Sequence, residues 1–144
     1  MTHRDAGRYA AKHGPLGSLD ARIAAALREK AAEGELACAE AEKIGAALGA
    51  PLEEVGRSLD LLEIRIGRCQ LGLFGYGKER KAVRPAERVE RELEAAIRAG
   101  LVGERLPCAT AWKIAAERSL PRMEVSGACE ALGVRIKPCQ LGAF

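Results

Sequence analysis

Cysteine is the residue type in this chain best suited to chemistry, because its thiolate binds soft metals and exchanges with disulfides. The chain has five cysteines, and four of them recur at a constant offset: Cys38 with Cys108, and Cys69 with Cys139. Four thiolates match the ligand number of a tetrahedral zinc site or an iron–sulfur cluster. No Cys-x-x-Cys pair occurs, however, and buried cysteine is common without any chemistry. A metal or thiol-sensing site and a plain structural role are therefore both open, and the spacing favours the structural role.

Other catalytic patterns are missing from the sequence. The two histidines, His3 and His13, lie near the start of the chain, and no serine or cysteine is arranged with them as a triad. No strand is followed by a GxGxxG or GxxxxGKS/T loop that would cradle phosphates. We therefore expect a protein that is not an enzyme and that has no cofactor.

Cys69 and Cys139 each begin the tetrapeptide Cys-Gln-Leu-Gly, and the repetition extends far beyond it. Residues 21–74 align with residues 91–144 without a gap, and 21 of the 54 pairs are identical. The chain is therefore two copies of one module. Each copy is near the size at which a separate core becomes marginal, so we expect the copies to pack together or the chain to form a homodimer.

The repeat divides the chain into a flexible tail at 1–17, a first module at 18–74, a linker at 75–85 and a second module at 86–144. Charge follows this division. The first copy is acidic, whereas residues 75–91 carry six basic and three acidic side chains. A basic segment between two modules is typical of an anionic partner.

Several classes of protein are excluded by composition. No run of apolar residues is long enough for a transmembrane helix. The basic residues near the start of the chain are not followed by the apolar stretch of a secretory signal. An odd number of cysteines without an export signal indicates a reducing compartment, so we expect a cytoplasmic protein with no membrane contact.

Hydrophobic periodicity predicts a mainly α fold with short β segments. In the first copy we expect helices at about 18–32, at 37–48 and from Pro51 onward, with Ser18 or Asp20 as the first N-cap. The alternating Ile64-Arg65-Ile66 predicts a strand, with Cys69–Phe74 returning as its partner. In the second copy the corresponding segments are these: helices at about 86–99, 108–118 and 121–131, and a strand at 134–136.

Three helices followed by a β element form the helix-turn-helix plan. Residues 41–55 resemble the winged helix-turn-helix family of bacterial regulators in Ile44-Gly45, the turn Leu48-Gly49-Ala50-Pro51, and Val55. The second copy matches at Ile114-Ala115, Pro121 and Val125. The resemblance implies two tandem three-helix winged-helix-like modules in a transcriptional regulator that binds double-stranded DNA.

The resemblance also implies that the third helix of each copy exposes a face toward the bases. These positions are Leu52, Glu53, Gly56, Arg57 and Asp60 in the first copy, and Arg122, Met123, Ser126, Gly127 and Glu130 in the second. Phosphate contacts would come from basic residues of the strands and the linker. The predicted nucleic-acid contacts are therefore Arg57, Arg65, Arg68, Lys78, Arg80, Lys81, Arg84, Arg122, Ser126 and Arg135.

Two other functions are compatible with the sequence. The acidic first copy favours a protein–protein interaction module that kept the fold without contacting DNA. The repeated cysteines favour a thiol or metal sensor, with Cys38, Cys69, Cys108 and Cys139 as the ligands.

Overall fold

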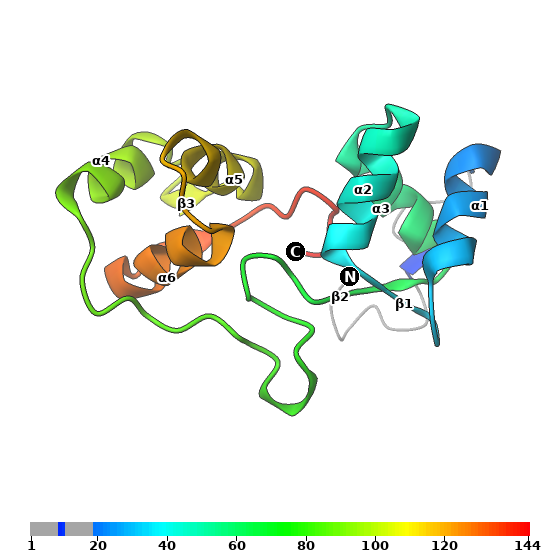
Figure 1. Ribbon diagram of the computed structural model, residues 1–144, viewed down its shortest axis with the longest axis horizontal. Coiled ribbons are helices and arrows are strands. Elements are labelled where there is room, and N and C mark those ends of the chain that lie inside the picture. Colours follow the sequence, from blue (N-terminus) through cyan, green and yellow to red (C-terminus); the bar gives the residue numbers. More distant parts are fainter. Residues whose placement is uncertain (1–8, 11–18) are drawn as a thin grey trace. The chain divides into compact units, whose positions relative to one another are not determined.

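The structure, a computed structural model, describes residues 9–10 and 19–144 (Figure 1). The described chain is mainly helical, with six α-helices and a few short strands, so the predicted fold class is confirmed. None of the helices in these ranges has the length and apolar character that crossing a bilayer requires. The predicted tail at 1–17 lies outside the described residues except for 9–10, and so does Ser18.

The chain forms two compact units that do not coincide with the two repeats predicted at 18–74 and 86–144. Unit 1 consists of the residues up to Cys69 together with Gln140–Phe144, and unit 2 consists of Gln70–Cys139. The segment that ends each repeat therefore belongs to the unit built from the other repeat. Both transfers occur at the same sequence position, the Cys-Gln bond of the Cys-Gln-Leu-Gly tetrapeptide.

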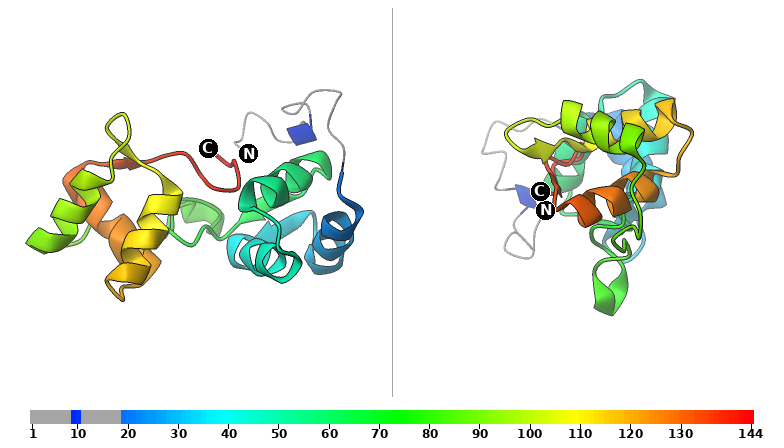
Figure 2. Two further views of the ribbon diagram at one scale, coloured as in Figure 1. Left: turned by 90° about the horizontal axis from the view of Figure 1, so that it is seen from above. Right: turned by 90° about the vertical axis from the view of Figure 1, so that its left-hand side faces the viewer.

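The helices of unit 1 are α1 (Ala21–Lys30), α2 (Cys38–Leu48) and α3 (Leu52–Leu61) (Figures 1 and 2). Asp20 is the N-cap of α1, and its Oδ1 accepts hydrogen bonds from the first turn at 2.9 and 3.3 Å. Gly49 ends α2 with a positive φ of 63°, a conformation that glycine adopts without strain. Three helices were predicted for this copy, and all three are present.

Apolar side chains of all three helices form the core of unit 1. Leu27, Val55 and Leu59 are fully buried, and each buried side chain of this size stabilises the fold by about 1.5–3 kcal/mol. The described part of the N-terminal tail adds to this unit. Tyr9 is buried, and the N–H groups of Tyr9 and Ala10 donate to the carboxylate of Glu63 at 3.0 and 2.7 Å.

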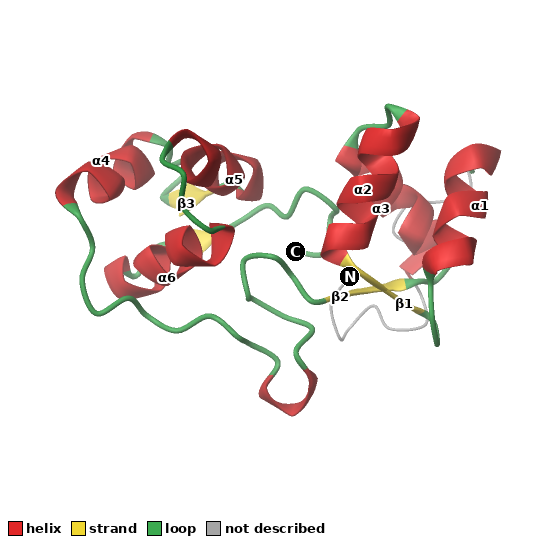
Figure 3. Ribbon diagram, in the orientation of Figure 1, coloured by secondary structure: helices red, strands yellow, loops and turns green. Residues whose placement is uncertain are grey.

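A two-stranded parallel ladder joins the ends of the helices in unit 1. It pairs β1 (Glu35–Ala37) with β2 (Arg65–Gly67). Strand β1 was not predicted, because three residues directly before a helix show no alternation. The strand predicted at Cys69–Phe74 is wrong, because this segment is a series of turns and bends (Figure 3). Arg68 has a φ of 46°, which turns the chain away from the ladder.

Unit 2 repeats the plan with α4 (Arg91–Ala99), α5 (Cys108–Glu117) and α6 (Arg122–Leu132) (Figure 2). Helix α4 begins at Arg91 instead of the predicted 86. The N–H of Ala86 donates to the carbonyl of Gly127 in α6 at 3.0 Å, so this stretch follows α6 in an extended form. Among the predicted helices, the start of α4 is the boundary with the largest error.

A second parallel ladder in unit 2 pairs β3 (Arg105–Leu106) with β4 (Arg135–Ile136). The pairing continues past the strands. The N–H of Lys137 donates to the carbonyl of Leu106 at 2.9 Å, and the N–H of Cys108 donates to the carbonyl of Pro138 at 3.0 Å. The core of this unit includes the fully buried side chains of Ile97, Leu106 and Val125.

Candidate nucleic-acid interface

The predicted nucleic-acid contacts are divided between the two units. Unit 1 holds Arg57, Arg65 and Arg68, whereas unit 2 holds all the others. The seven contacts in unit 2 are Lys78, Arg80, Lys81, Arg84, Arg122, Ser126 and Arg135. Each group is therefore described within its own unit.

The arginines of unit 1 lie at its surface beside carboxylates. Arg65 pairs with Glu35 across the ladder at 3.0 Å, and Arg57 pairs with Glu54 within α3 at 3.5 Å. Arg68 is exposed directly after β2. Exposed ion pairs such as that of Arg65 with Glu35 contribute only about 0–1 kcal/mol.

The face of α3 predicted to read bases is partly covered. Gly56 and Asp60 are buried, and the backbone of Leu141 lies against Gly56. The expectation that these two positions are exposed is therefore corrected, and at Gly56 the covering segment is Gln140–Phe144, which is part of unit 1. The exposed part of α3 is its acidic first turn, which contains Glu53 and Glu54.

Arg122, at the start of α6, is held by two side chains of unit 2. Its guanidinium stacks over the ring of Trp112 with 3.6 Å between Cζ and the ring centroid. It also donates to Oε1 of Gln70 at 2.8 Å. Stacking over an indole suits arginine. In this arrangement Arg122 connects α5, α6 and the segment that follows Cys69, so reading a base would require it to leave both partners.

The middle of α6 is covered by an extended stretch of the chain. Ser126 is fully buried, and a Cβ placed on Gly127 would lie 2.9 Å from the carbonyl oxygen of Arg84. The prediction that Ser126 is an exposed contact is corrected for this reason. The run of small residues Ser126-Gly127-Ala128 is the sequence signal that was missed, because small side chains let another backbone approach a helix closely.

The basic loop, which we define as residues 75–88, contains five exposed cations of unit 2: Lys78, Arg80, Lys81, Arg84 and Arg88. A short 3₁₀ turn, η3 (Gly77–Glu79), carries Lys78, and Arg80 follows it. Arg84 pairs with Glu79 at 3.3 Å, and Lys81 pairs with Glu130 of α6. These ion pairs hold the loop against itself and against α6 while their lysine and arginine side chains stay near solvent.

Charge distinguishes the two units more clearly than any single side chain. Unit 2 contains thirteen basic and nine acidic residues, a net charge of +4, whereas unit 1 has a net charge of −1. Comparisons with protein-family models, with curated proteins and with solved structures found no match. The chemistry of the units themselves therefore carries the functional argument.

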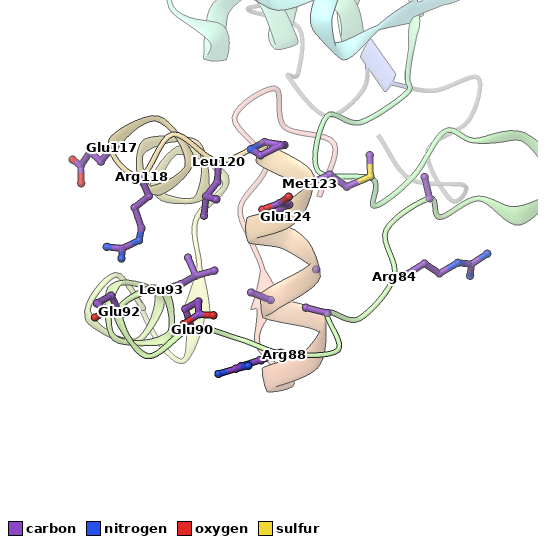
Figure 4. Close-up of a pocket in the computed structure, with 15 residues that line it drawn as sticks. Arg84, Arg88, Glu90, Glu92, Leu93, Glu117, Arg118, Leu120, Met123 and Glu124 are labelled. Carbon is purple, nitrogen blue, oxygen red and sulfur yellow. The ribbon is translucent and has the colours of Figure 1, made fainter.

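Unit 2 also has an open pocket of about 910 Å³ beside α6 (Figure 4). It lies between α4, the turn before α6, α6 itself and residues 82–88. Leu93 and Leu120 supply apolar lining, as does Met123. The charged lining is mixed, with three arginines and four glutamates: Arg84, Arg88, Arg118, Glu90, Glu92, Glu117 and Glu124. Because both signs are present, this pocket is not a phosphate site of the kind that a single-sign cluster forms.

The cysteines do not form a metal centre in the described part of either unit. No three side chains among cysteine, histidine, aspartate and glutamate converge there. Unit 1 contains Cys38 and Cys69, and unit 2 contains Cys108, Cys139 and Cys129. The pKa of Cys129 is raised to about 11, chiefly by burial and to a smaller extent by the negative charge of the neighbouring Glu130.

Proposed function

We propose that this protein binds double-stranded DNA through the phosphate backbone, with unit 2 as the main contact, and that it acts as a transcriptional regulator. The observation that carries the proposal is the net charge of +4 on unit 2. Cationic side chains displace counterions from the duplex, and this release supplies most non-specific affinity. The five cysteines, all present as thiols, support a cytoplasmic location.

The helix-turn-helix plan supports a specific geometry for contact between these cationic side chains and DNA. Helices α5 and α6 are joined by a short turn that ends at Pro121, as α2 and α3 are joined by one that ends at Pro51. Such a pair can enter a major groove with its second helix. In unit 2, however, Arg122 is held by Gln70, and Ser126 is buried. We therefore propose contact with phosphates and low discrimination between base sequences.

The decisive experiment measures the affinity for a labelled duplex by fluorescence anisotropy at increasing salt. The variant replaces four basic residues of the loop by glutamine: Lys78, Arg80, Arg84 and Arg88. The matched control makes the same change of charge at four exposed residues of unit 1: Arg22, Arg28, Lys30 and Lys43. A plot of the logarithm of the association constant against the logarithm of the salt concentration has a negative slope. Each lost phosphate contact is expected to reduce the magnitude of this slope by about 0.9.

Two results would contradict this function. One is an affinity for duplex DNA weaker than about 10⁻⁴ M at physiological salt, the weak limit of non-specific binding. The other is an equal loss of affinity in the loop variant and in the unit 1 control, since that would reflect net charge alone.

A second candidate function is protein–protein interaction through unit 1. The specific observation is the exposed acidic turn of α3, where Glu53 and Glu54 lie at the surface of a unit with net charge −1. Acidic surfaces repel phosphate and select basic partners. A stoichiometric protein partner that dissociates after Glu53→Lys and Glu54→Lys, from a protein without DNA affinity, would favour this candidate over the first.

A further inference from the structure

The backbone of unit 2 brings two cysteines side by side. The N–H of Cys108, the first residue of α5, donates to the carbonyl of Pro138 at 3.0 Å. Cys139 is the next residue. A hydrogen bond to the preceding carbonyl leaves the two cysteine α-carbons about 5–7 Å apart. Disulfides span α-carbon distances of about 4.4–6.8 Å, so this separation is suitable for one.

Unit 1 has its two cysteines at the equivalent sequence positions, just beyond the end of its own parallel ladder. The ladder there ends at the pair Ala37 and Gly67. Cys38 follows Ala37 directly, and Cys69 lies two residues after Gly67. Both cysteines are buried, each with 6% of its surface exposed. Each parallel ladder is therefore followed by one cysteine on either strand.

The second cysteine of each pair occupies a particular place in the chain. Cys69 is the last residue before the chain passes from unit 1 into unit 2, and Cys139 is the last before it returns. A bond from either residue to the start of the middle helix would fix the point at which the chain leaves its unit. Such a bond would restrain the segments that end the two repeats (70–74 and Gln140–Phe144) without contacting them.

We propose that Cys38 with Cys69, and Cys108 with Cys139, are dithiol pairs that close to disulfides when the surroundings become oxidising. The oxidant is a low-molecular-weight disulfide of the glutathione type. One cysteine thiolate attacks it, which forms a mixed disulfide and releases one thiol. The second cysteine thiolate then attacks the first cysteine sulfur and releases the other thiol. Two electrons pass from each protein pair to the oxidant, and two protons are transferred with them.

The two pairs differ in access to the oxidant. Cys139 is partly exposed, whereas both Cys38 and Cys69 are buried. Attack on an external disulfide requires access to the thiolate. The pair in unit 2 therefore closes first, with Cys139 as the attacking residue. Cys129 is also buried, and no repeat-equivalent cysteine exists for it, since Leu59 occupies that position.

The test starts from the fully reduced full-length chain. It is incubated without metal in oxidised glutathione, sampled over time, alkylated after denaturation and digested for mass spectrometry. The expected first product has two fewer alkylated thiols and one peptide pair joined through Cys108 and Cys139. The expected final product has four fewer thiols and a second pair joined through Cys38 and Cys69, with Cys129 alkylated throughout.

Variants separate pairing from general reactivity. Cys139→Ser is expected to remove the early disulfide and leave the later one, and Cys108→Ala is expected to leave Cys139 joined to glutathione. Cys129→Ala is the matched control. In this variant both cysteine pairs are expected to form disulfides at the wild-type rate. Mapping the wild-type chain depends on no variant, so poor folding of any variant leaves the test intact. The proposal is overturned by disulfides to Cys129, by bonds between chains, or by a wild-type Cys139 that stays joined to glutathione.

Discussion

The backbone of Leu141, near the end of the chain, lies against Gly56 in the middle of α3, in the space where any other residue would place its Cβ. This contact explains how a segment from the second repeat becomes part of unit 1. The closing segment of the second copy packs on the third helix of the first copy. Leu141 is itself buried there, with 3% of its surface exposed.

The first prediction concerns this contact. Gly56→Ala is expected to lower the free energy of unfolding by about 1–3 kcal/mol, because the added methyl group displaces the backbone of Leu141. In a chain that ends at Cys139, the same change is expected to be stabilising by up to about 1 kcal/mol, because alanine is the better helix former. Urea unfolding followed by circular dichroism gives all four values of this double-mutant cycle.

The cycle contains its own control, since the change in helix propensity is the same in both chains. An equal effect of Gly56→Ala in the full-length and shortened chains would show that Gln140–Phe144 does not pack on α3 in solution.

The second prediction concerns Arg122 and Trp112. Arg122→Ala is expected to lower the free energy of unfolding by about 1–2 kcal/mol, because both the cation–π contact and the hydrogen bond to Gln70 are lost. Trp112 is the only tryptophan in the chain, so its fluorescence reports the change directly. Emission is expected to move to longer wavelength as water replaces the guanidinium.

Arg57→Ala is the matched control for this measurement. Arg57 is a half-buried arginine on α3, where it pairs with Glu54. Its removal is expected to leave the emission of Trp112 unchanged. If both variants moved the emission equally, the stacking of Arg122 on Trp112 would not explain the signal.

How much of this fold follows from the sequence can be judged from particular residues. Gly49 and Pro51 mark the end of α2 and the beginning of α3, because local backbone preferences decide such boundaries. Leu71 and Leu141, the leucines of the two Cys-Gln-Leu-Gly tetrapeptides, are both buried. The unit that buries each of them was not predictable, since identical Cys-Gln-Leu-Gly segments fit either third helix equally well by pattern.

The candidate interface was also only partly predictable from the sequence. The exposed basic residues Lys78 and Arg80 could be found by charge alone. The close approach to Gly127, beside the buried Ser126, could not, because the backbone of Arg84 that makes it lies about forty positions earlier in the chain. A helical wheel contains no information about such distant partners. The small residues beside Ser126 were the only local sign of the close approach.

The third prediction uses the raised pKa of Cys129. Its pKa moves from an ordinary value near 9 to about 11 in the folded protein, so between these values the unfolded chain has lost the proton and the folded chain retains it. The stabilising contribution is therefore complete below about pH 9 and falls by about 1.4 kcal/mol per pH unit up to about pH 11. Cys129→Ala is expected to abolish this part of the pH dependence.

Urea unfolding of both proteins at a series of pH values checks this slope. The relevant quantity is the difference in the free energy of unfolding between wild type and variant, because the contributions of all other groups cancel in it. A difference that stays constant between about pH 9 and pH 11 would mean that the Cys129 thiol ionises as readily in the folded chain as in the unfolded one.

The last prediction measures what the proposed disulfides do to stability. Each bond would close a loop of 31 residues, from Cys38 to Cys69 or from Cys108 to Cys139. Restricting the unfolded chain in this way is expected to raise the free energy of unfolding by roughly 3–4 kcal/mol for each bond. The reduced and oxidised proteins are compared by urea unfolding, and the oxidised protein is compared again after reduction.

The position of each bond also predicts a local effect on the rate of amide exchange. Because Cys69 and Cys139 precede the exchanged segments, oxidation is expected to slow amide exchange in β2 and β4, which lie inside the closed loops. The Ala86 amide lies outside both loops and is bound to Gly127, so its local opening is expected to keep its rate. Oxidation that protected Ala86 as strongly as Ile66 would indicate global stabilisation without a local effect at the crossing points.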